Sequence, residues 1–169
     1  VRPGAIETRE QEQWVLRRQA VDRVRDARSS RELACLLGGA IGDALGYRVE
    51  FETLAAIRRV HGTAGIRLAA ATGELVVSDD TQMTLFTLEG QVRAARDGPP
   101  LVDAIRQAYL DWYRTQRGAW NARDPSPASG LARHAVLWQA QAPGTTCLSA
   151  LRAGGLGSVE APINGSGRR

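Results

Sequence analysis

The sequence predicts an all-α fold on three observations. Apolar residues recur at helical spacing in several separate stretches. Glycine and proline divide these stretches, as Gly98, Pro99 and Pro100 do after residues 79–97. No stretch alternates apolar and polar residues as a half-buried strand does, and no internal repeat is found. With 169 residues, 43 % of them hydrophobic, the chain is long and apolar enough for one folded core.

Two helices are expected at the start of the chain. Residues 7–28 carry many charges and only a sparse apolar stripe, which is typical of a solvated surface helix or, alternatively, of an arm that binds nucleic acid. Residues 32–46 predict a buried helix. Its Gly38, Gly42 and Gly46 are four residues apart and remove the side chains from one face. Since glycine disfavours helix interiors, we expect close packing or ligand access at that face.

The remaining elements follow from apolar spacing and from turn residues. Residues 79–97 strongly favour a helix, with an apolar face formed by Leu85, Leu88, Val92 and Ala95. Further helices are expected at 53–61, where a turn is the alternative, at 101–116, where the helix is broadly amphipathic, and at 131–141. A last short helix is expected to begin with a cap at Thr145 or Thr146 and to run to Leu151. Residues 62–77 are expected to be irregular, 118–130 to form a loop, and 154–169 to form an end rich in Gly, Ser and Pro.

Composition excludes several classes of protein. The formal charge of +4 is mild and the arginines are interspersed with acids, so no nucleic-acid partner is expected. No apolar run is long enough to cross a bilayer and no secretory signal is visible, so we expect no membrane partner. Cys35 and Cys147 make no disulfide framework, which favours a cytoplasmic location.

Ser78, Asp79 and Asp80 form the strongest candidate site. Hydroxyl and carboxylate oxygens are the donors that Mg²⁺ and Mn²⁺ prefer. Adjacent helical residues project about 100° apart, so the two aspartates can face two ions, or one ion and a water. The alternative is a structural role, in which Ser78 caps the helix and the two acids complement its dipole.

Other polar residues are weaker candidates. Asp43 interrupts a glycine-rich apolar helix, so it is either a buried hydrogen-bonding group or a functional acid. Glu50, just beyond that helix, is either an exposed surface acid or part of a site. His61 and His134 belong to no cluster and are expected to be structural or solvated. Cys147 has no evident base nearby, so we do not expect it to act as a nucleophile. The sequence has no paired Cys or His spacing of the kind that predicts a zinc site.

Four segments, in order, resemble the motifs of one family. They read LLGGAIGDALGYRVE, SDDTQM, PGTTCLSAL and PINGS, and they extend from about Leu33 to Ser166. Together they resemble the ADP-ribosylglycohydrolases, the family of dinitrogenase reductase-activating glycohydrolase. The resemblance implies a compact, orthogonal multi-helix domain over residues 31–169, preceded by a charged helical extension over residues 1–30.

The resemblance also implies an activity and a site. The family hydrolyses the glycosidic bond that joins ADP-ribose to an acceptor, with a binuclear Mg²⁺ or Mn²⁺ centre. The expected partner is an ADP-ribosylated protein or a small molecule that contains ADP-ribose. By match to the motifs, Ser78, Asp79 and Asp80 are metal ligands, and the catalytic residues are Glu50, Asp79 and Asp80. The substrate-binding residues are Asp43, Gly46, Asn164, Gly165 and Ser166.

The sequence departs from the family pattern after Ser166. The family's second acidic motif, which completes the metal shell, is not found there, and the chain continues only with Gly167, Arg168 and Arg169. We therefore expect this chain to correspond to the N-terminal part of the domain and to hold cations weakly, so that it is either the metal-dependent hydrolase that the resemblance implies or a truncated, inactive form of it. The alternative function is a non-catalytic helical module that binds ADP-ribose or a protein.

Overall fold

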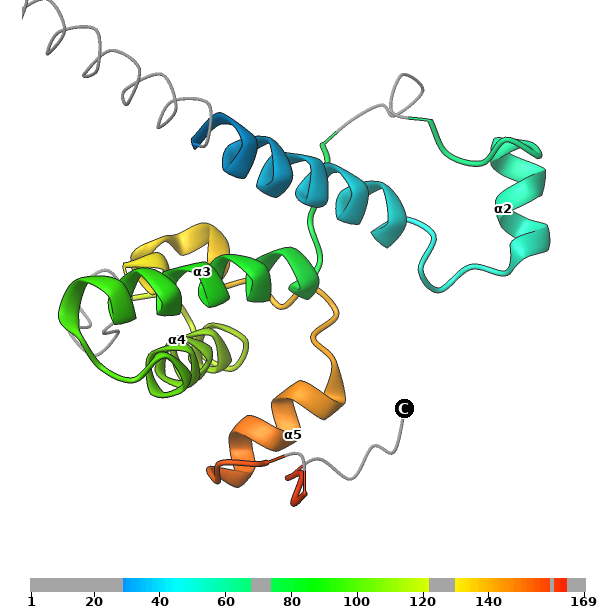
Figure 1. Cartoon of the computed structure of the whole chain (residues 1–169). Helices are drawn as coiled ribbons and strands as arrows, with labels where there is room; N and C mark the ends of the chain where they lie inside the picture. Colours follow the sequence, from blue (N-terminus) through cyan, green and yellow to red (C-terminus); the bar gives the residue numbers. More distant parts are fainter. Residues whose placement is uncertain (1–28, 68–73, 122–129, 159, 164–169) are drawn as a thin grey trace, which may run out of the picture. The chain divides into compact units, whose positions relative to one another are not determined.

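The structure is a computed structural model of the chain and describes residues 29–67, 74–121, 130–158 and 160–163 (Figure 1). These residues form helices and turns without any strand, which confirms the all-α prediction. None of the helices in these ranges is long and apolar enough to cross a bilayer. The chain divides into two compact units, Val1–Ala40 and Ile41–Arg169. The predicted helix at 7–28 lies outside the described residues, and the predicted division into 1–30 and 31–169 stays a prediction.

The helix predicted at 32–46 is present and extends over residues 29–47. Its expected burial is only partly correct. Within the second unit Ala44 is buried at 1 % exposure, whereas Ile41 is 37 % exposed. At Gly42 and Gly46, no described atom beyond their own helix and chain neighbours lies within 4 Å of the position that a Cβ would take. The close packing expected at these two glycines is therefore not found in the described part of the chain.

A short helix, α2 (Leu54–His61), confirms the prediction for residues 53–61. The Thr53 side chain accepts a hydrogen bond from the Ala56 N–H, as an N-cap residue does. The helix ends at Gly62, whose φ of 73° suits glycine. Residues 62–67 and 74–77 that follow it have no regular structure, as predicted.

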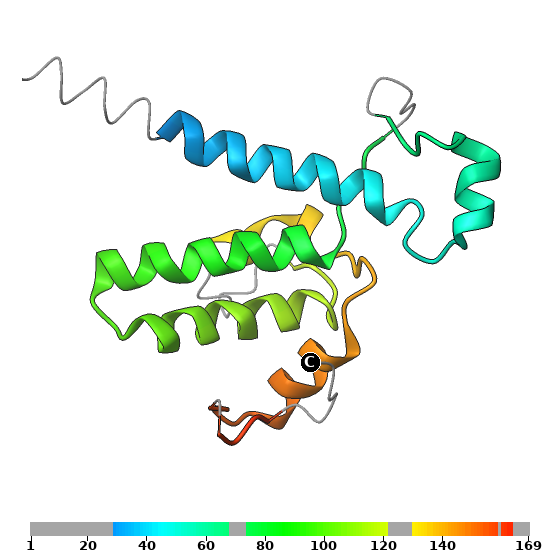
Figure 2. The same cartoon turned by 45° about the vertical axis from the view of Figure 1, so that its right-hand side comes forward.

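Two long helices form the centre of the second unit. Helix α3 (Asp79–Asp97) has the bounds predicted from the sequence, and α4 (Leu101–Thr115) begins three residues after Gly98, which closes α3 in the left-handed conformation at φ 79°. The two helices run antiparallel, side by side (Figure 2). At their closest approach, a Cβ on Gly90 of α3 would lie 2.5 Å from the Cα of Ile105. Glycine at position 90 therefore permits this separation.

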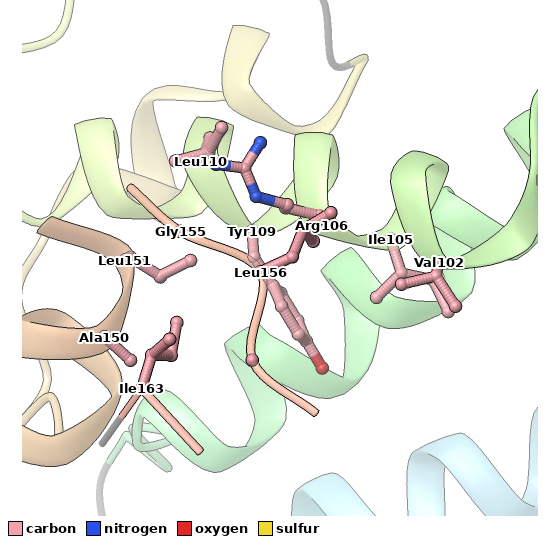
Figure 3. Close-up of a pocket in the computed structure, with 11 residues that line it drawn as sticks. Val102, Ile105, Arg106, Tyr109, Leu110, Ala150, Leu151, Gly155, Leu156 and Ile163 are labelled. Carbon is pink, nitrogen blue, oxygen red and sulfur yellow. The ribbon is translucent and has the colours of Figure 1, made fainter. Parts of the chain in front are cut away.

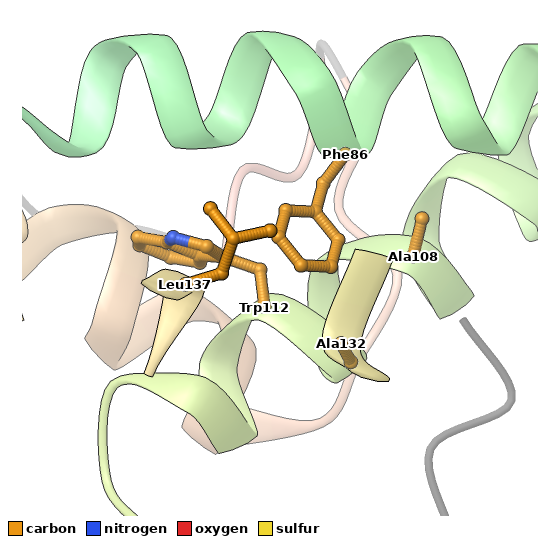
Figure 4. Close-up of a cluster of buried hydrophobic side chains, with 5 residues drawn as sticks. All are labelled: Phe86, Ala108, Trp112, Ala132 and Leu137. Carbon is orange, nitrogen blue, oxygen red and sulfur yellow. The ribbon is translucent and has the colours of Figure 1, made fainter. Parts of the chain in front are cut away.

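The buried core lies between these helices and the chain that follows them. Figure 4 shows Phe86 projecting from α3 toward Trp112 of α4, with Leu137 and Ala132 beside them. Ala108 completes the cluster, and both aromatic side chains have 0 % exposure. Trp112 and Ala108 lie on the amphipathic helix predicted at 101–116.

The predicted apolar face of α3 is wrong in part. Leu88 and Val92 are 38 % and 52 % exposed, while the buried positions of the helix are Gln82, Phe86 and Gly90. Helix α3 thus turns a partly polar face inward, because hydrogen-bonding groups of the chain after α4 lie against it.

A buried charge on α4 was likewise not predicted. The Asp111 carboxylate is fully buried and pairs with Arg93 at 3.0 Å and with Arg114 at 2.9 Å. Arg93 also pairs with Glu89 at 3.2 Å. Each charge in this network has an opposite partner, as buried charges require.

The single helix predicted at 131–141 is not formed. Two 3₁₀ turns, η2 (Leu131–Arg133) and η3 (Ala135–Leu137), are separated by His134 in extended conformation. The Glu89 carboxylate accepts hydrogen bonds from the N–H groups of Gly130 at 2.7 Å and Leu131 at 3.1 Å, which anchors η2 to α3.

The short helix predicted near the end of the chain is α5 (Thr145–Ala153). Its N-cap is Gly144, and no side chain caps its first turn. The predicted threonine cap is therefore wrong, because the helix already includes Thr145 and Thr146. Helix α5 ends at Gly154, whose φ of 76° is left-handed.

Candidate functional site

Ser78, Asp79 and Asp80 stand together at the start of α3. The Ser78 hydroxyl accepts a hydrogen bond from the Asp80 N–H at 3.1 Å, and Ser78 is only 3 % exposed. Asp79 and Asp80 occupy the first turn, where negative charge complements the helix dipole. The capping role considered for Ser78 is thus present, and it leaves the carboxylates of both aspartates on the same helix end.

Asp43 joins this cluster from the helix over residues 29–47. Its Oδ2 atom accepts hydrogen bonds from the Ser78 N–H at 2.8 Å and from the Thr81 hydroxyl. Partial burial acts to raise the pKa of Asp43, but the bonds from Ser78 and Thr81 outweigh it, and the net pKa lies below the usual value. Asp43 is therefore the hydrogen-bonding group considered from the sequence. Its donors, however, belong to the start of α3 and not to its own helix end.

Asp79 is held by the segment that precedes α5. Its N–H donates to the Gln141 carbonyl at 2.9 Å, and its Oδ2 atom accepts from the Gly144 N–H at 3.0 Å. Burial raises the pKa of Asp79, the bond from Gly144 acts against this, and the negative charges of Asp80 and Asp43 raise the pKa further. The site therefore gathers three acids whose mutual repulsion a cation would relieve.

Cys147 lies beside this cluster on α5. Burial raises the pKa of its thiol, and the negative charges of Asp79 and Asp80 raise it further. A thiol with a raised pKa stays protonated at neutral pH and is a poor nucleophile. This agrees with the sequence-based expectation that Cys147 does not act as one.

The structure does not bring every predicted residue to this place. Glu50 is exposed on the turn after the helix, and no described contact joins its side chain to α3. Gly46 opens the same turn, where its carbonyl accepts from the Val49 N–H at 3.0 Å. Asn164, Gly165 and Ser166 lie outside the described residues. The proposed roles of these five residues stay predictions.

Sequence reasoning missed four residues that build the site. Thr81, Gln82 and Gly144 belong to the SDDTQM and PGTTCLSAL motifs, and membership of these motifs was a usable signal. Gln141 lies outside the four motifs, and an isolated glutamine in a loop is ordinarily a surface residue.

The donor chemistry of this cluster suits a hard divalent cation. The Ser78 hydroxyl and the carboxylates of Asp79 and Asp80 are oxygen donors, which Mg²⁺ and Mn²⁺ prefer over nitrogen or sulfur. In the described ranges, no three His, Cys, Asp or Glu side chains are arranged as a metal site. The residues thus fit Mg²⁺ or Mn²⁺ in the type of donor atom, although the described side chains are not arranged as a metal site.

A separate cavity of about 350 Å³ lies between α4, α5 and the chain after Gly154 (Figure 3). Its lining is largely apolar, with Leu110, Leu151 and Ile163 facing one another. Arg106 at its edge donates to the Gly154 carbonyl. Among the predicted site residues that the structure describes, none lines this cavity.

Comparison with known proteins identifies the family. The family model for ADP-ribosylglycohydrolase matches residues 24–168, which is most of the chain. Comparisons with curated proteins and with solved structures give no match. The matched family consists of hydrolases that act on ADP-ribosylated substrates and are generally metal-dependent. The matched range contains Asp43 and the Ser78–Asp80 cluster, and the chain belongs to the ADP-ribosylglycohydrolase family.

Proposed function

We propose that this chain provides the metal-binding side of a site that hydrolyses the glycosidic bond between ADP-ribose and a protein side chain or a related conjugate. The family match over residues 24–168 supports this proposal. The observation that carries it is the gathering of Asp43, Asp79 and Asp80 around the start of α3, where Ser78 is only 3 % exposed, Asp43 and Asp79 are half-buried and Asp80 is exposed. Surface acids that merely cap a helix need no such support from two other segments.

In this proposal Ser78, Asp79 and Asp80 hold Mg²⁺ or Mn²⁺. The Ser78 hydroxyl accepts one bond from Asp80 and retains a second lone pair for a ligand. Asp79 accepts the Gly144 N–H at Oδ2, and this bond leaves its other oxygen available to a cation. When bound, two such ions supply positive charge that orients ribose hydroxyls and increases the acidity of water.

The protein residues then have distinct tasks. Cleavage at the anomeric carbon develops positive charge on the ribose and requires a positioned water on one face. Asp79 or Asp80 accepts the proton of that water, for which a carboxylate within hydrogen-bond reach is sufficient. Glu50, exposed on its turn, orients the substrate, and Asp43 and Gly46 contribute from the adjacent helix end. Asn164, Gly165 and Ser166 contact the ADP-ribose part.

Cation binding tests the proposal most directly. We expect millimolar Mn²⁺ or Mg²⁺ to raise the melting temperature of the chain, because a ligand that binds only the folded state stabilises it. Asp79→Asn and Asp80→Asn should abolish this rise. Asp103→Asn is the matched control, since Asp103 is an exposed acid in the first turn of α4 and should leave the rise intact. An equal rise in Asp80→Asn and wild type would contradict the metal assignment.

Turnover tests the catalytic part separately. ADP-ribosyl-arginine is incubated with wild-type protein and with the same three variants, and release of ADP-ribose is measured. Hydrolysis that survives in both Asp79→Asn and Asp80→Asn would remove these residues from the reaction. Binding of ADP-ribose without hydrolysis and without binding of Mn²⁺ or Mg²⁺ would favour the non-catalytic binding module instead.

A further inference from the structure

The segment Gln139–Gly144, here called the strap, connects η3 to α5 without regular secondary structure. Three hydrogen bonds attach it to α3. The Gln82 Nε2 donates to the Gln139 carbonyl at 3.1 Å, the Asp79 N–H donates to the Gln141 carbonyl at 2.9 Å, and the Gly144 N–H donates to Asp79 Oδ2 at 3.0 Å. The orientation of the Asp79 carboxylate therefore depends on where the strap lies.

The strap is not in a conformation that its own residues favour. Among the described residues, Ala142 is the one non-glycine with positive φ, at 53°. A left-handed alanine costs about 1–2 kcal/mol relative to a right-handed one. Ala142 stands between Gln141 and Gly144, the two residues bonded to Asp79. Contacts with α3 therefore have to hold the strained backbone in place.

Gln82 is the anchor that ties the strap to the core. Its side chain is buried at 2 % exposure, and its Oε1 atom accepts from the Trp112 indole N–H at 3.1 Å and from Gln116 Nε2 at 2.9 Å. An indole nitrogen can only donate, so the atom facing Trp112 must be the amide oxygen. The amide nitrogen is thereby directed at the Gln139 carbonyl. Position 82 thus requires a side chain that accepts at one end and donates at the other.

We propose that Gln82 is a positioning residue for Asp79. It fixes the start of the strap to α3 and α4, so that Gly144 meets Asp79 Oδ2 and leaves the second carboxylate oxygen turned to a ligand. The effect of Gln82 on cation affinity rests on the proposed function. Its effect on the position of the strap does not. Residues that orient a metal ligand through a hydrogen bond commonly change metal affinity by about 10–100-fold when they are replaced.

Two substitutions at position 82 separate this role from packing. Gln82→Glu keeps an oxygen acceptor for Trp112 and Gln116, but when ionised it cannot donate to the Gln139 carbonyl. Gln82→Met keeps the length and loses both functions. Glu89→Gln is the matched control, because Glu89 attaches the far end of the same chain through its hydrogen bonds with the Gly130 and Leu131 N–H groups.

Amide hydrogen exchange of the metal-free protein is the first measurement. We expect the Gly144 and Asp79 amides to exchange about tenfold faster or more in Gln82→Glu and Gln82→Met, because their closed state is less populated. Glu89→Gln should speed exchange at Gly130 and Leu131 only. Unchanged exchange at Gly144 in the folded Gln82→Glu protein would overturn the proposal.

Titration with Mn²⁺, well below the melting temperature of each variant, is the second measurement. We expect the Kd to rise about tenfold or more in both Gln82 variants and to stay unchanged in Glu89→Gln. An unchanged Kd in Gln82→Glu, with wild type binding normally, would also overturn the positioning role. If the wild-type protein itself binds no Mn²⁺, the metal assignment fails, and amide exchange still decides whether Gln82 holds the strap.

Discussion

Replacing Gly90 by alanine tests the contact between the two long helices. A Cβ at this position would lie 2.5 Å from the Cα and 2.9 Å from the backbone N of Ile105. Carbon atoms pack at about 3.5–4.0 Å, so the added methyl group overlaps by roughly 1 Å. Ile105 Cγ1 also lies 2.9 Å from this position and could move with a change of rotamer, but the other two atoms belong to the backbone of α4 and could not. The helices must therefore separate, and the packing of Phe86 against Trp112 loosens with them.

The expected cost follows from two opposing effects. Overpacking of a core costs about 1–3 kcal/mol, and a clash with backbone belongs near the upper end. Alanine gains about 1 kcal/mol over glycine in a helix interior. The net loss is about 2 kcal/mol, which corresponds to a fall in melting temperature of roughly 4–8 °C for a chain of this size.

Thermal unfolding followed by circular dichroism measures this fall. Gly42→Ala is the matched control, because Gly42 is also helical, is exposed, and has no described neighbour within 4 Å of its Cβ position beyond its own helix. Its melting temperature should stay level or rise. A Gly90→Ala protein as stable as wild type would show that α3 and α4 do not approach each other this closely.

Three further predictions concern acidic side chains. Asp111→Ala leaves Arg93 without its buried partner and should lower the free energy of unfolding by about 3 kcal/mol, measured by urea denaturation; a loss under about 1 kcal/mol would contradict the ion pair. Asp43→Ala leaves the Ser78 N–H without its acceptor and should cost about 1–2 kcal/mol in thermal unfolding, whereas an unchanged melting temperature would refute that bond. The raised pKa of Asp79 means that protons compete with a cation above the usual aspartate range, so stabilisation by Mn²⁺ should weaken as pH falls toward that range from above. Stabilisation that is constant down to about pH 4 would contradict this.

Helix positions were predictable because the signals that start and stop a helix are local. Helix α3 has its predicted bounds since Ser78 caps one end and Gly98, followed by two prolines, closes the other. Helix α2 is delimited in the same way by Thr53 and Gly62. Where the sequence offered only apolar spacing, as at 131–141, the backbone formed two 3₁₀ turns instead of a helix.

The buried face of α3 was not predictable from apolar periodicity. Its inward positions include Asp79, Gln82 and Glu89, because the chain opposite is irregular and presents N–H and carbonyl groups that need partners. Leucine and valine, which a periodicity analysis places inside, cannot satisfy such groups. In the sequence, the polar residues of such an inward face give the same pattern as the polar residues of a solvent-exposed helix face.

The candidate site was predictable in its composition but not in its supports. Ser78 and the two acids after it were recognised from residue type and position. The bond between Asp43 and Ser78 joins residues 35 apart, and the spacing of a sequence does not reveal which distant segments meet. Glu50 shows the same limit, because its motif match does not determine where an exposed side chain points.

The polar inward face of α3 determines how the segment after α4 is aligned along this helix. An apolar helix face can pack against a neighbouring segment in several alignments with similar free energy, because hydrophobic contacts have little directionality. Hydrogen bonds to fixed carbonyl and amide groups form in one alignment only. A shift of the segment by a single residue would leave several of these polar groups buried without a partner. A connection with no ladder or helix of its own therefore acquires a single alignment from the helix that it crosses.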